Sequence, residues 1–431
     1  MTTTTSTAIR PAEGPLRGRV RVPGDKSVAH RAAIVGAIAR GATEIRAYPE
    51  SADAEATLSV LSAVGIPVRR TGVGVRIEGR GWDGFRAPRA PVSCMRSGTT
   101  MRLMAGVLAA AGSRATLTGD PQLLARPMER VADPLRVMGA RITTEDGRPP
   151  IEIEPAALRG VRYELPVASA QVKSAILLAG LRAAGETTVV ERLPTRDHTE
   201  RLLSWLDARI SIGAEVPRSI SIRPSELAAF ELEVPGDPSS AAPILAAAAL
   251  IPGSEVVLDG VGLNPSRTAF AALLSTMGAR IDLEENHTAG PEPVGRIVAR
   301  HGALRAASIG ADEVPALIDE LPLVGVVAAF AEGVTEVRGA GELRVKESDR
   351  IRGLVENLRL LGVDAEEVRD GFVVRGPSRP RGGGADARGD HRLAMALAVL
   401  GLAAEGPVSV AGMDSVDDSF PGFLDTLDGL R

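Results

Sequence analysis

The sequence predicts an α/β protein in which two domains are each built from three copies of one repeat. Two observations lead to this prediction. One sequence pattern, a polar opening followed by an apolar stretch, recurs six times along the 431 residues. The copies are about 70 residues apart, which is the size of one repeated structural unit. The chain is also too long for a single compact core, so two cores are expected.

Each copy of the pattern predicts one buried helix followed by a strand. It begins with Gly, Ser, Asp or Thr, which suit helix N-caps, and continues with about three turns of Ala- and Leu-rich sequence before a glycine stop. Because these stretches are apolar nearly all round, we expect them to pack against sheets. They begin at Gly24, Ser97, Ser169, Gly236, Asp319 and Gly389.

Shorter segments between these helices predict the remaining strands of each repeat. Residues 75–85, 140–147 and 364–376 combine β-prone residues with turn signals, and several such segments follow a second, amphipathic helix. Each repeat is therefore predicted to contain, in order, a helix, a strand, a second helix and further strands. Three copies per domain divide the chain near Pro235 and Gly236, a pair that suits a hinge.

Composition excludes several classes of protein. The chain has 50 Lys and Arg against 54 Asp and Glu, for a net charge of −4, so it lacks the field of a nucleic-acid binder. A single cysteine, Cys94, excludes an internal disulfide framework and a multi-thiolate metal site. We interpret it as a small buried apolar residue. No cofactor and no metal are expected.

The chain shows no targeting or membrane signal. Its first residues are polar and lack an apolar signal core, and its longest apolar run, residues 393–404, is shorter than the roughly 18 residues that cross a bilayer. We therefore expect a cytoplasmic, soluble protein with no membrane partner.

Cations gather where the predicted buried helices begin. The cations at these starts are Lys26, Arg31, Arg102, Lys173 and Arg392. Helix N-termini also present unpaired N–H groups and a positive dipole end, which bind anions. If the repeats aim their helices alike, the two domains face each other across an anion-attracting cleft. A ligand with several negative charges is implied.

The charge run GELRVKESDR, residues 341–350, has two readings. On one helix, Lys346 and Arg350 would stand one turn apart and share a face. A charge run taken alone is most often a solvated surface, but this one could also form a wall of the cleft. The residues themselves leave both readings open.

A series of ordered motifs between Val20 and Phe423 resembles the 5-enolpyruvylshikimate-3-phosphate synthase family. The motifs are PGDKSVAHR (23–31), SGTTMRL (97–103), RPM (126–128), SAQVKSAILLAGL (169–181), TRDHTE (195–200), VPGDPSSAA (234–242), IDELP (318–322), LRVKESDR (343–350), GDHRLAMA (389–396) and SFPGF (419–423). The resemblance implies two domains, each of three βαβαββ units with buried helices, in an inverse α/β barrel or prism with the active site between them. Residues 23–235 would form domain one, and residues 1–22 with 236–431 domain two.

The resemblance also implies a reaction. The family joins the enolpyruvyl group of phosphoenolpyruvate to the 5-hydroxyl of shikimate 3-phosphate by addition and elimination, releasing phosphate, in chorismate and aromatic amino acid biosynthesis. Such chemistry needs a base, an acid and cations that hold two phosphates and two carboxylates. The two substrates would be the only partners of a monomeric enzyme, without nucleic acid.

Site residues follow from the resemblance, motif by motif. Asp319 would accept the hydroxyl proton, Glu347 would be the acid and base at the methylene carbon, and Lys26 would contact phosphoenolpyruvate and share in proton transfer. The residues implied for shikimate 3-phosphate are Lys26, Ser27, Arg31, Ser169, Ala170, Gln171, Arg196, Asp319 and Lys346. Those implied for phosphoenolpyruvate are Lys26, Gly98, Arg126, Gln171, Arg350 and Arg392.

The sequence departs from the family pattern at two places. Arg96 stands where many members have Asn, and Asp418 stands where some carry a lysine, so Asp418 is left out of the site. Gly98 is the small residue that leaves room for the inhibitor glyphosate in sensitive members.

Two alternative functions fit the sequence less well. UDP-N-acetylglucosamine enolpyruvyl transferase typically carries Lys-Asn in place of Lys26-Ser27, and a reactive cysteine about twenty residues beyond Cys94; both features are missing here. An inactive anion-binding homologue would gain from losing Asp319 and Glu347. Both carboxylates are present, which favours an enzyme.

Overall fold

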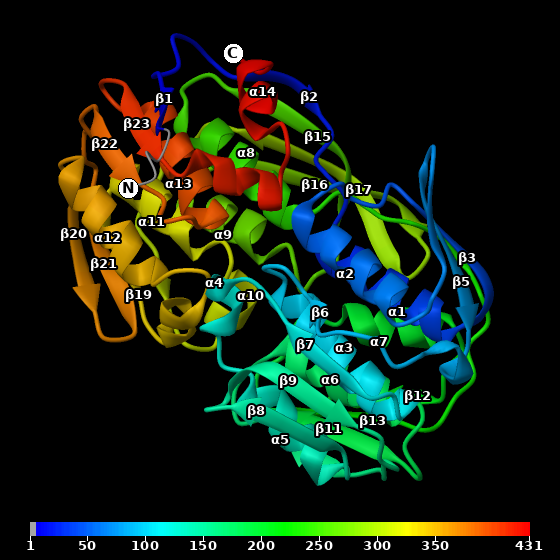
Figure 1. The fold of residues 1–431 in the computed structure, drawn as a ribbon. Coiled ribbons are helices and arrows are strands. Elements are labelled where there is room, and N and C mark those ends of the chain that lie inside the picture. Colours follow the sequence, from blue (N-terminus) through cyan, green and yellow to red (C-terminus); the bar gives the residue numbers. More distant parts are fainter. Residues whose placement is uncertain (1–5) are drawn as a thin grey trace. The chain divides into compact units, whose positions relative to one another are not determined.

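The computed structural model describes residues 6–431, which divide into two compact units. Unit 1 contains residues 6–25, Gly236–His287 and Pro293–Arg431. Unit 2 contains Lys26–Pro235 and the short segment Thr288–Glu292. The elements of both units can be followed by their labels (Figure 1).

Unit 2 is built from three four-stranded sheets with one shared pattern of pairing. In each sheet a short edge strand runs parallel to its neighbour, and the remaining pairs are antiparallel. The first sheet is β14 (Glu231–Glu233), β3 (Arg40–Arg46), β5 (Gly74–Arg80) and β4 (Val68–Thr71); the second is β6 (Val92–Ser93), β7 (Ala115–Thr118), β9 (Arg148–Glu154) and β8 (Arg141–Glu145); the third is β10 (Arg162–Glu164), β11 (Thr187–Glu191), β13 (Arg218–Ile222) and β12 (Ile210–Ile212).

Three helices that are buried along nearly their whole length form the centre of unit 2. They are α1 (Lys26–Ile38), α3 (Gly98–Ala111) and α6 (Ala170–Gly180). A Cβ added to Gly106 of α3 would lie 2.3 Å from the carbonyl oxygen of Ala175 in α6, so these two helices meet backbone to backbone. The helices α2 (Ala52–Ala63), α4 (Pro121–Leu124), α5 (Glu129–Val137) and α7 (His198–Trp205) complete the unit.

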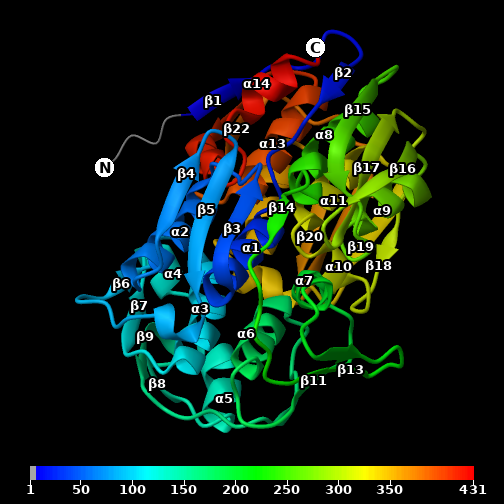
Figure 2. The same ribbon diagram turned by 90° about the vertical axis from the view of Figure 1, so that its right-hand side faces the viewer.

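Unit 1 repeats the same plan with one shorter sheet. Its sheets are β16 (Arg280–Ala289), β17 (Glu292–Arg300), β15 (Glu255–Gly262) and β2 (Arg17–Val20); β18 (Ser308–Ile309), β19 (Gly333–Val337), β21 (Gly371–Gly376) and β20 (Asp364–Val368); and β1 (Ser6–Ile9), β23 (Val408–Ala411) and β22 (Gly383–Asp386). Its buried helices are α8 (Pro238–Leu250), α11 (Leu321–Phe330) and α13 (His391–Ala403). Around them lie α9 (Ala269–Met277), α10 (Val314–Leu317), α12 (Arg350–Leu360) and α14 (Phe423–Asp428) (Figure 2).

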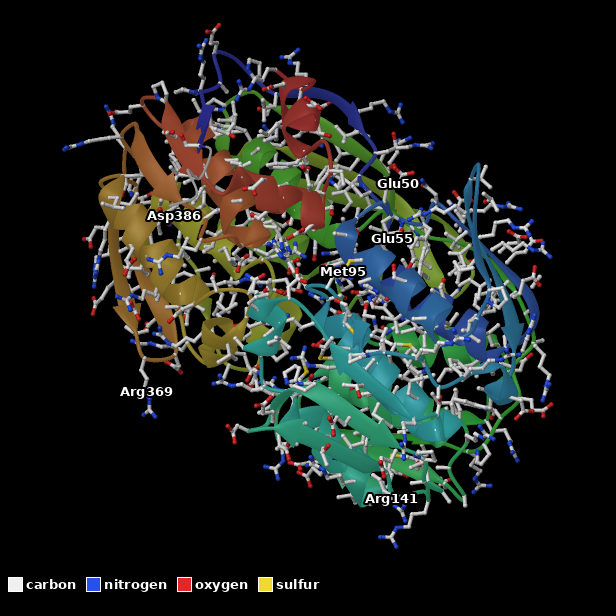
Figure 3. All side chains as sticks on the ribbon, viewed as in Figure 1. Glu50, Glu55, Met95, Arg141, Arg369 and Asp386 are labelled. Carbon is white, nitrogen blue, oxygen red and sulfur yellow. The ribbon has the colours of Figure 1, made fainter. Side chains whose placement is uncertain are left out.

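The outer faces of the sheets are polar, as strands with one buried face require. In β8, exposed Arg141 alternates with buried Ile142. Arg369, in the turn between β20 and β21, extends away from the ribbon into solvent (Figure 3). In these examples the charges lie on the outer side of the sheet, and the apolar side is left for the helices.

The predicted fold class is confirmed, because each predicted buried helix is present and six small mixed sheets surround them. The three predicted β segments coincide with most of β5, with β8 and with the β20–β21 hairpin. Residues 23–25 lie in unit 1 and residues 288–292 in unit 2, which differs slightly from the predicted ranges. Residues 1–5 lie outside the described residues. The assignment of the units to the two family domains, and the cleft between them, stay predictions.

The prediction of one helix through the charge run at 341–350 is wrong. Residues Gly341–Val345 form a 3₁₀ helix, and Lys346 is extended, with φ −81° and ψ −153°. Helix α12 begins only at Arg350, because the Asp349 side chain accepts a hydrogen bond from the backbone N–H of Arg352 at 3.0 Å and so caps the helix. Lys346 and Arg350 therefore do not share a helical face.

Two simpler predictions can be compared directly with the described residues. Cys94 is buried, as predicted, and burial raises the pKa of its thiol. Within residues 6–431, none of the helices combines the length and apolar character needed to span a bilayer.

Thr187→Val is expected to stabilise the protein. Thr187 is fully buried at the start of β11, and its Oγ1 has no hydrogen-bond partner among the described residues. Replacing an unsatisfied buried hydroxyl by a methyl group of similar shape should raise the free energy of unfolding by about 1 kcal/mol. Thr188→Val is the matched control and should destabilise, because the Thr188 hydroxyl bonds to Ser221 Oγ at 2.8 Å. Urea unfolding of both variants tests this; a less stable Thr187→Val would contradict it.

Candidate active site

In unit 2, the predicted ligand residues stand at the first turns of the three buried helices. Lys26, Gly98 and Ala170 are the first residues of α1, α3 and α6. Ser97 and Ser169 cap α3 and α6 by accepting hydrogen bonds from backbone N–H groups. The positive end of the helix dipole lies at each of these starts, which makes each a potential anion site.

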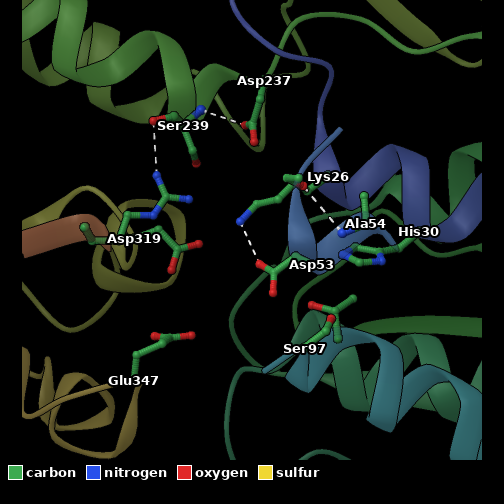
Figure 4. A network of polar contacts seen from close by, with 12 residues as sticks. Lys26, His30, Asp53, Ala54, Ser97, Asp237, Ser239, Asp319 and Glu347 are labelled. Carbon is green, nitrogen blue, oxygen red and sulfur yellow. Dashed lines mark hydrogen bonds and ion pairs between the residues drawn. The ribbon is translucent and has the colours of Figure 1, made fainter. Parts of the chain in front are cut away.

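Lys26 forms an ion pair that the sequence did not predict. Its Nζ lies 2.8 Å from Oδ2 of Asp53, in the first turn of α2. Both side chains are largely shielded from solvent, with 13% and 21% exposed, and the two point toward each other in Figure 4. An acidic residue in the first turn of a helix is common, so the sequence held no specific signal for Asp53.

Arg31 joins the starts of α1 and α6 to α7. Its Nη1 donates to the carbonyl oxygen of Ser27 at 2.9 Å, its Nη2 to Ser174 Oγ at 2.9 Å, and its Nε to Thr199 Oγ1 at 2.7 Å. The guanidinium is buried. These bonds fix Ser27, another predicted site residue, beside the first turns of α6.

The first turns of α3 and α6 are joined through Gln171. Its Nε2 donates to Thr99 Oγ1 at 2.7 Å, and its Oε1 accepts from Arg102 Nη1 at 2.6 Å. A Cβ at Gly98 would lie 2.9 Å from both Arg102 Nη1 and Arg126 Nη1. Two guanidinium groups therefore flank the bare backbone at the start of α3. Arg102 was predicted as a cation at a helix start but not as a site residue.

Lys173 does not contribute its charge to an anion site, so that prediction is wrong. Its Nζ lies 3.0 Å from Glu191 Oε2 and 2.6 Å from Glu200 Oε1, and all three side chains have no exposed surface. Thr195 also donates its hydroxyl to Glu191 at 2.8 Å. This buried ion-pair cluster, Lys173, Glu191 and Glu200, supports the loop that carries the predicted site residue Arg196.

In unit 1, the two predicted catalytic carboxylates meet on one buried guanidinium. Arg350 Nη2 donates to Glu347 Oε2 at 2.6 Å, and Nη1 lies 3.5 Å from Asp319 Oδ1. Its Nε donates to Asp390 Oδ2 at 2.8 Å. Burial alone would lower the pKa of Arg350, but the three carboxylates outweigh it and raise that pKa. Arg350 is therefore a permanent cation that holds Asp319 and Glu347 near each other.

Asp390 connects this group to the start of α13. Its Oδ1 caps the helix by accepting from the backbone N–H of Arg392 at 2.9 Å, while its Oδ2 receives Arg350. Arg392 Nη1 in turn donates to the carbonyl oxygen of Ser239 in α8 at 3.1 Å. The sequence did not predict Asp390. Lys346, predicted for shikimate 3-phosphate, is half-buried on the segment before α12.

A second buried guanidinium supports the start of α8. Arg267 bonds to Asp25 Oδ2 at 2.7 Å, to Asp237 Oδ1 at 2.8 Å and to Ser239 Oγ at 2.9 Å. Asp237 also caps α8 through the backbone N–H of Ser239, as Figure 4 shows. Asp25, the residue directly before Lys26 in the chain, is thereby held by Arg267 within unit 1.

A sequence model of EPSP synthase (3-phosphoshikimate 1-carboxyvinyltransferase) matches residues 11–427. The chain belongs to the EPSP synthase family. It is 46% identical to the 3-phosphoshikimate 1-carboxyvinyltransferase of Salinibacter ruber, with 96% of each chain covered, and 47% identical to that of Acidithiobacillus ferrooxidans, with 95% and 94% covered. The solved structure of EPSP synthase from Acinetobacter baumannii matches with a TM-score of 0.87 at 41% identity, covering 99% of this chain and 98% of that one.

Membership of the EPSP synthase family confirms the resemblance found in the sequence. It also favours this family over the nucleotide-sugar enolpyruvyl transferase. The predicted residues form two groups within the units. Lys26, Ser27, Arg31, Gly98, Arg126, Ser169, Ala170, Gln171 and Arg196 lie in unit 2, and Asp319, Lys346, Glu347, Arg350 and Arg392 lie in unit 1. Their individual roles stay predictions.

The burial of His30, on α1 of this EPSP synthase family member, leads us to expect that the fold loses stability in acid. The pKa of His30 is lowered to about 4, mainly by burial; the Asp53 carboxylate opposes this shift, and the Lys26 and Arg31 charges add to it. In unfolded protein a histidine titrates near 6.5. Stability linked to His30 is therefore complete above pH 6.5 and lost as pH falls toward 4, by up to about 3 kcal/mol. Urea unfolding from pH 4 to 7 should show a weaker pH dependence for His30→Asn.

His287→Asn, at an exposed position of β16, is the control for this titration and should behave like the unmodified protein. Equal pH dependence of His30→Asn and the unmodified protein would contradict the prediction.

Proposed function

We propose that this chain is a 3-phosphoshikimate 1-carboxyvinyltransferase that moves the enolpyruvyl group of phosphoenolpyruvate to the 5-hydroxyl of shikimate 3-phosphate. Its family membership is the observation that carries the activity. The geometry adds a supporting fact, since Asp319 and Glu347, the two groups assigned to proton transfer, both contact Arg350. This activity is the one predicted from the sequence.

Two carboxylates on one cation suit an addition followed by an elimination. In the addition, Asp319 takes the proton of the 5-hydroxyl while the hydroxyl oxygen bonds to the central carbon of phosphoenolpyruvate. Glu347 protonates the methylene carbon in the same step. In the elimination, Glu347 takes a proton back from the resulting methyl group while the carbon–oxygen bond to phosphate breaks, and the departing phosphate receives the proton that Asp319 had taken. Lys26 contacts phosphoenolpyruvate and shares in this proton transfer.

The remaining residues hold the charged substrates. Gly98, Arg126, Gln171, Arg350 and Arg392 bind the phosphate and carboxylate of phosphoenolpyruvate, with Lys26. Ser27, Arg31, Ser169, Ala170, Gln171, Arg196, Asp319 and Lys346 bind shikimate 3-phosphate, again with Lys26. The start of α3 supports this part of the proposal. Gly98 has no side chain there, and two guanidinium groups lie beside its backbone, so hydrogen-bond donors and positive charge are gathered where an anion could bind.

Phosphate release tests the activity. The purified protein is given phosphoenolpyruvate with either shikimate 3-phosphate or UDP-N-acetylglucosamine, and release is expected only with shikimate 3-phosphate. Asp319→Asn and Glu347→Gln should abolish it, whereas Asp349→Asn should not, because asparagine also caps helices and Asp349 serves α12. Release with the nucleotide sugar would transfer the assignment to the sister enzyme, and no release with either would indicate a binding protein.

The finer predictions on location and assembly belong to the same proposal: a cytoplasmic monomer whose partners are these two substrates, with no nucleic acid. The near-balanced charge, net −4, supports the absence of a nucleic-acid partner. Light scattering of the purified protein tests the monomer, and a dimer mass would contradict it.

A further inference from the structure

Four buried side chains of unit 2 form a continuous hydrogen-bonded row that the proposed mechanism does not use. His30 Nδ1 lies 2.7 Å from Thr57 Oγ1, Thr57 Oγ1 lies 2.7 Å from Thr100 Oγ1, and Thr100 Oγ1 lies 2.9 Å from Ser97 Oγ. The exposed fraction of each residue is 3% or less. This row, His30–Thr57–Thr100–Ser97, joins α1 and α2 to the cap of α3 (Figure 4 shows its two ends).

The direction of the row follows from counting hydrogens. The Thr100 hydroxyl donates to Ser97 Oγ, and a hydroxyl has one hydrogen to give. Thr100 must therefore accept from Thr57, and Thr57, having used its own hydrogen, must accept from His30. Burial keeps His30 neutral at pH 7, because its pKa is about 4. The neutral imidazole consequently carries its hydrogen on Nδ1.

Ser97, at the end of the row, is left with one unused bonding group. Its Oγ accepts from the Thr100 hydroxyl and also from the Thr100 backbone N–H at 3.2 Å, which fills both lone pairs. Its hydroxyl hydrogen has no acceptor among the described residues. By contrast, the caps Ser51 and Ser169 each accept only one bond, from a backbone N–H at 3.4 Å. The Ser97 hydrogen can therefore only be donated to a further group.

The surroundings of Ser97 indicate what that group is. Ser97 directly precedes Gly98, where a Cβ would lie 2.9 Å from the guanidinium nitrogens of Arg102 and Arg126. The start of α3 adds unpaired N–H groups and the positive end of the helix dipole. The guanidinium and N–H groups named here are all donors, and an anionic oxygen is the acceptor that suits such a place.

We propose that Ser97 is an additional phosphoenolpyruvate-binding residue, which donates its hydroxyl hydrogen to an anionic oxygen at the start of α3, and that His30 is a positioning residue that fixes this direction through Thr57 and Thr100. The inference rests on the proposed function for the identity of the anion. Reversing the row would turn the Ser97 oxygen into an acceptor facing an anion, which is unfavourable; a neutral His30 with its hydrogen on Nδ1 prevents this reversal.

Ser97→Ala is the first test, read by steady-state kinetics and by direct calorimetric titration with phosphoenolpyruvate and with inorganic phosphate. The KM for phosphoenolpyruvate and the Kd for both anions should rise about tenfold, the effect of losing one hydrogen bond to a charged group. The KM for shikimate 3-phosphate should change less than about twofold. Ser51→Ala removes a cap of the same kind from α2 and is the matched control: its thermal stability should fall similarly, with anion affinity unchanged.

Variants at His30 test the positioning role. His30→Asn retains an N–H donor near Nδ1 and should keep the KM for phosphoenolpyruvate within about twofold, whereas His30→Leu removes the donor and should raise it about threefold or more at equal thermal stability. Unchanged anion affinity in Ser97→Ala, or equal kinetics of His30→Asn and His30→Leu, would overturn the proposal. If the unmodified protein turns over no substrate, the proposed function fails, while the titrations still decide whether Ser97 binds an anion.

Discussion

Replacing Lys173 with methionine is expected to lower the free energy of unfolding by about 3–5 kcal/mol, the usual cost of leaving a buried charge without its partner. The substitution keeps the length of the apolar stem but removes the ammonium that lies 3.0 Å from Glu191 and 2.6 Å from Glu200. Both carboxylates have no exposed surface, so water cannot replace the lost charge. Urea unfolding at pH 7 measures the effect.

Arg192→Met is the matched control for this prediction. Arg192 lies next to Glu191 in the chain but pairs with Glu164 at the surface, with 78% of its side chain exposed. A surface pair of this kind contributes roughly 0–1 kcal/mol, so this variant should unfold almost like the unmodified protein. Similar losses in both variants would contradict the buried-charge explanation. Adding Glu200→Gln to Lys173→Met should recover part of the stability, because one unpaired charge is removed.

Replacing Arg350 with lysine is expected to reduce kcat/KM by about 10³ or more, even though the charge is kept. The guanidinium reaches Asp319, Glu347 and Asp390 through three different nitrogens. A lysine ammonium is a single compact donor group and cannot hold three carboxylates in this planar arrangement. Both proposed proton-transfer groups would therefore lose their positions, and kcat should fall together with affinity for phosphoenolpyruvate.

Steady-state kinetics with Arg352→Lys as control tests the Arg350 prediction. Arg352 is on the same helix, is exposed and pairs with Glu356, so its conservative replacement should leave kcat/KM within about twofold. A change of less than tenfold in Arg350→Lys would show that a point charge is sufficient at this position. It would then favour an electrostatic role of Arg350 over a geometric one.

The predictable part of this molecule was the part encoded locally. Apolar stretches with polar openings locate the buried helices, and α1, α3 and α6 begin within two residues of the predicted starts at Gly24, Ser97 and Ser169. What could not be read from the sequence was which charges pair across the fold. Lys173 and Lys26 look alike as cations near helix starts, yet one is sealed against Glu191 and Glu200 and the other is partly exposed beside Asp53.

The charge run at 341–350 shows the same limit. Helix spacing allowed Lys346 and Arg350 to share a face, but Asp349 uses its carboxylate as a cap and so delays the helix. The role of Arg350 depends on Asp390, 40 residues further along the chain. Similarly, Asp25 within the motif PGDKS pairs with Arg267, 242 residues away. No local sequence pattern identifies such distant partners. The family resemblance predicted the substrate-binding residues but not the residues that hold them in position.

The backbone contact between Gly106 and Ala175 determines how precisely the starts of α3 and α6, both proposed to bind anions, are spaced. Gln171 joins the first turns of α3 and α6, and further along the two main chains touch where a Cβ would lie 2.3 Å from a carbonyl oxygen. The separation of the two helices is thus set by main-chain atoms, whose dimensions do not change with sequence. Side chains elsewhere in the core can be replaced without changing the distance between Gly98 and Gln171 in the first turns of α3 and α6. A larger residue at Gly106, by contrast, would force the two helices apart.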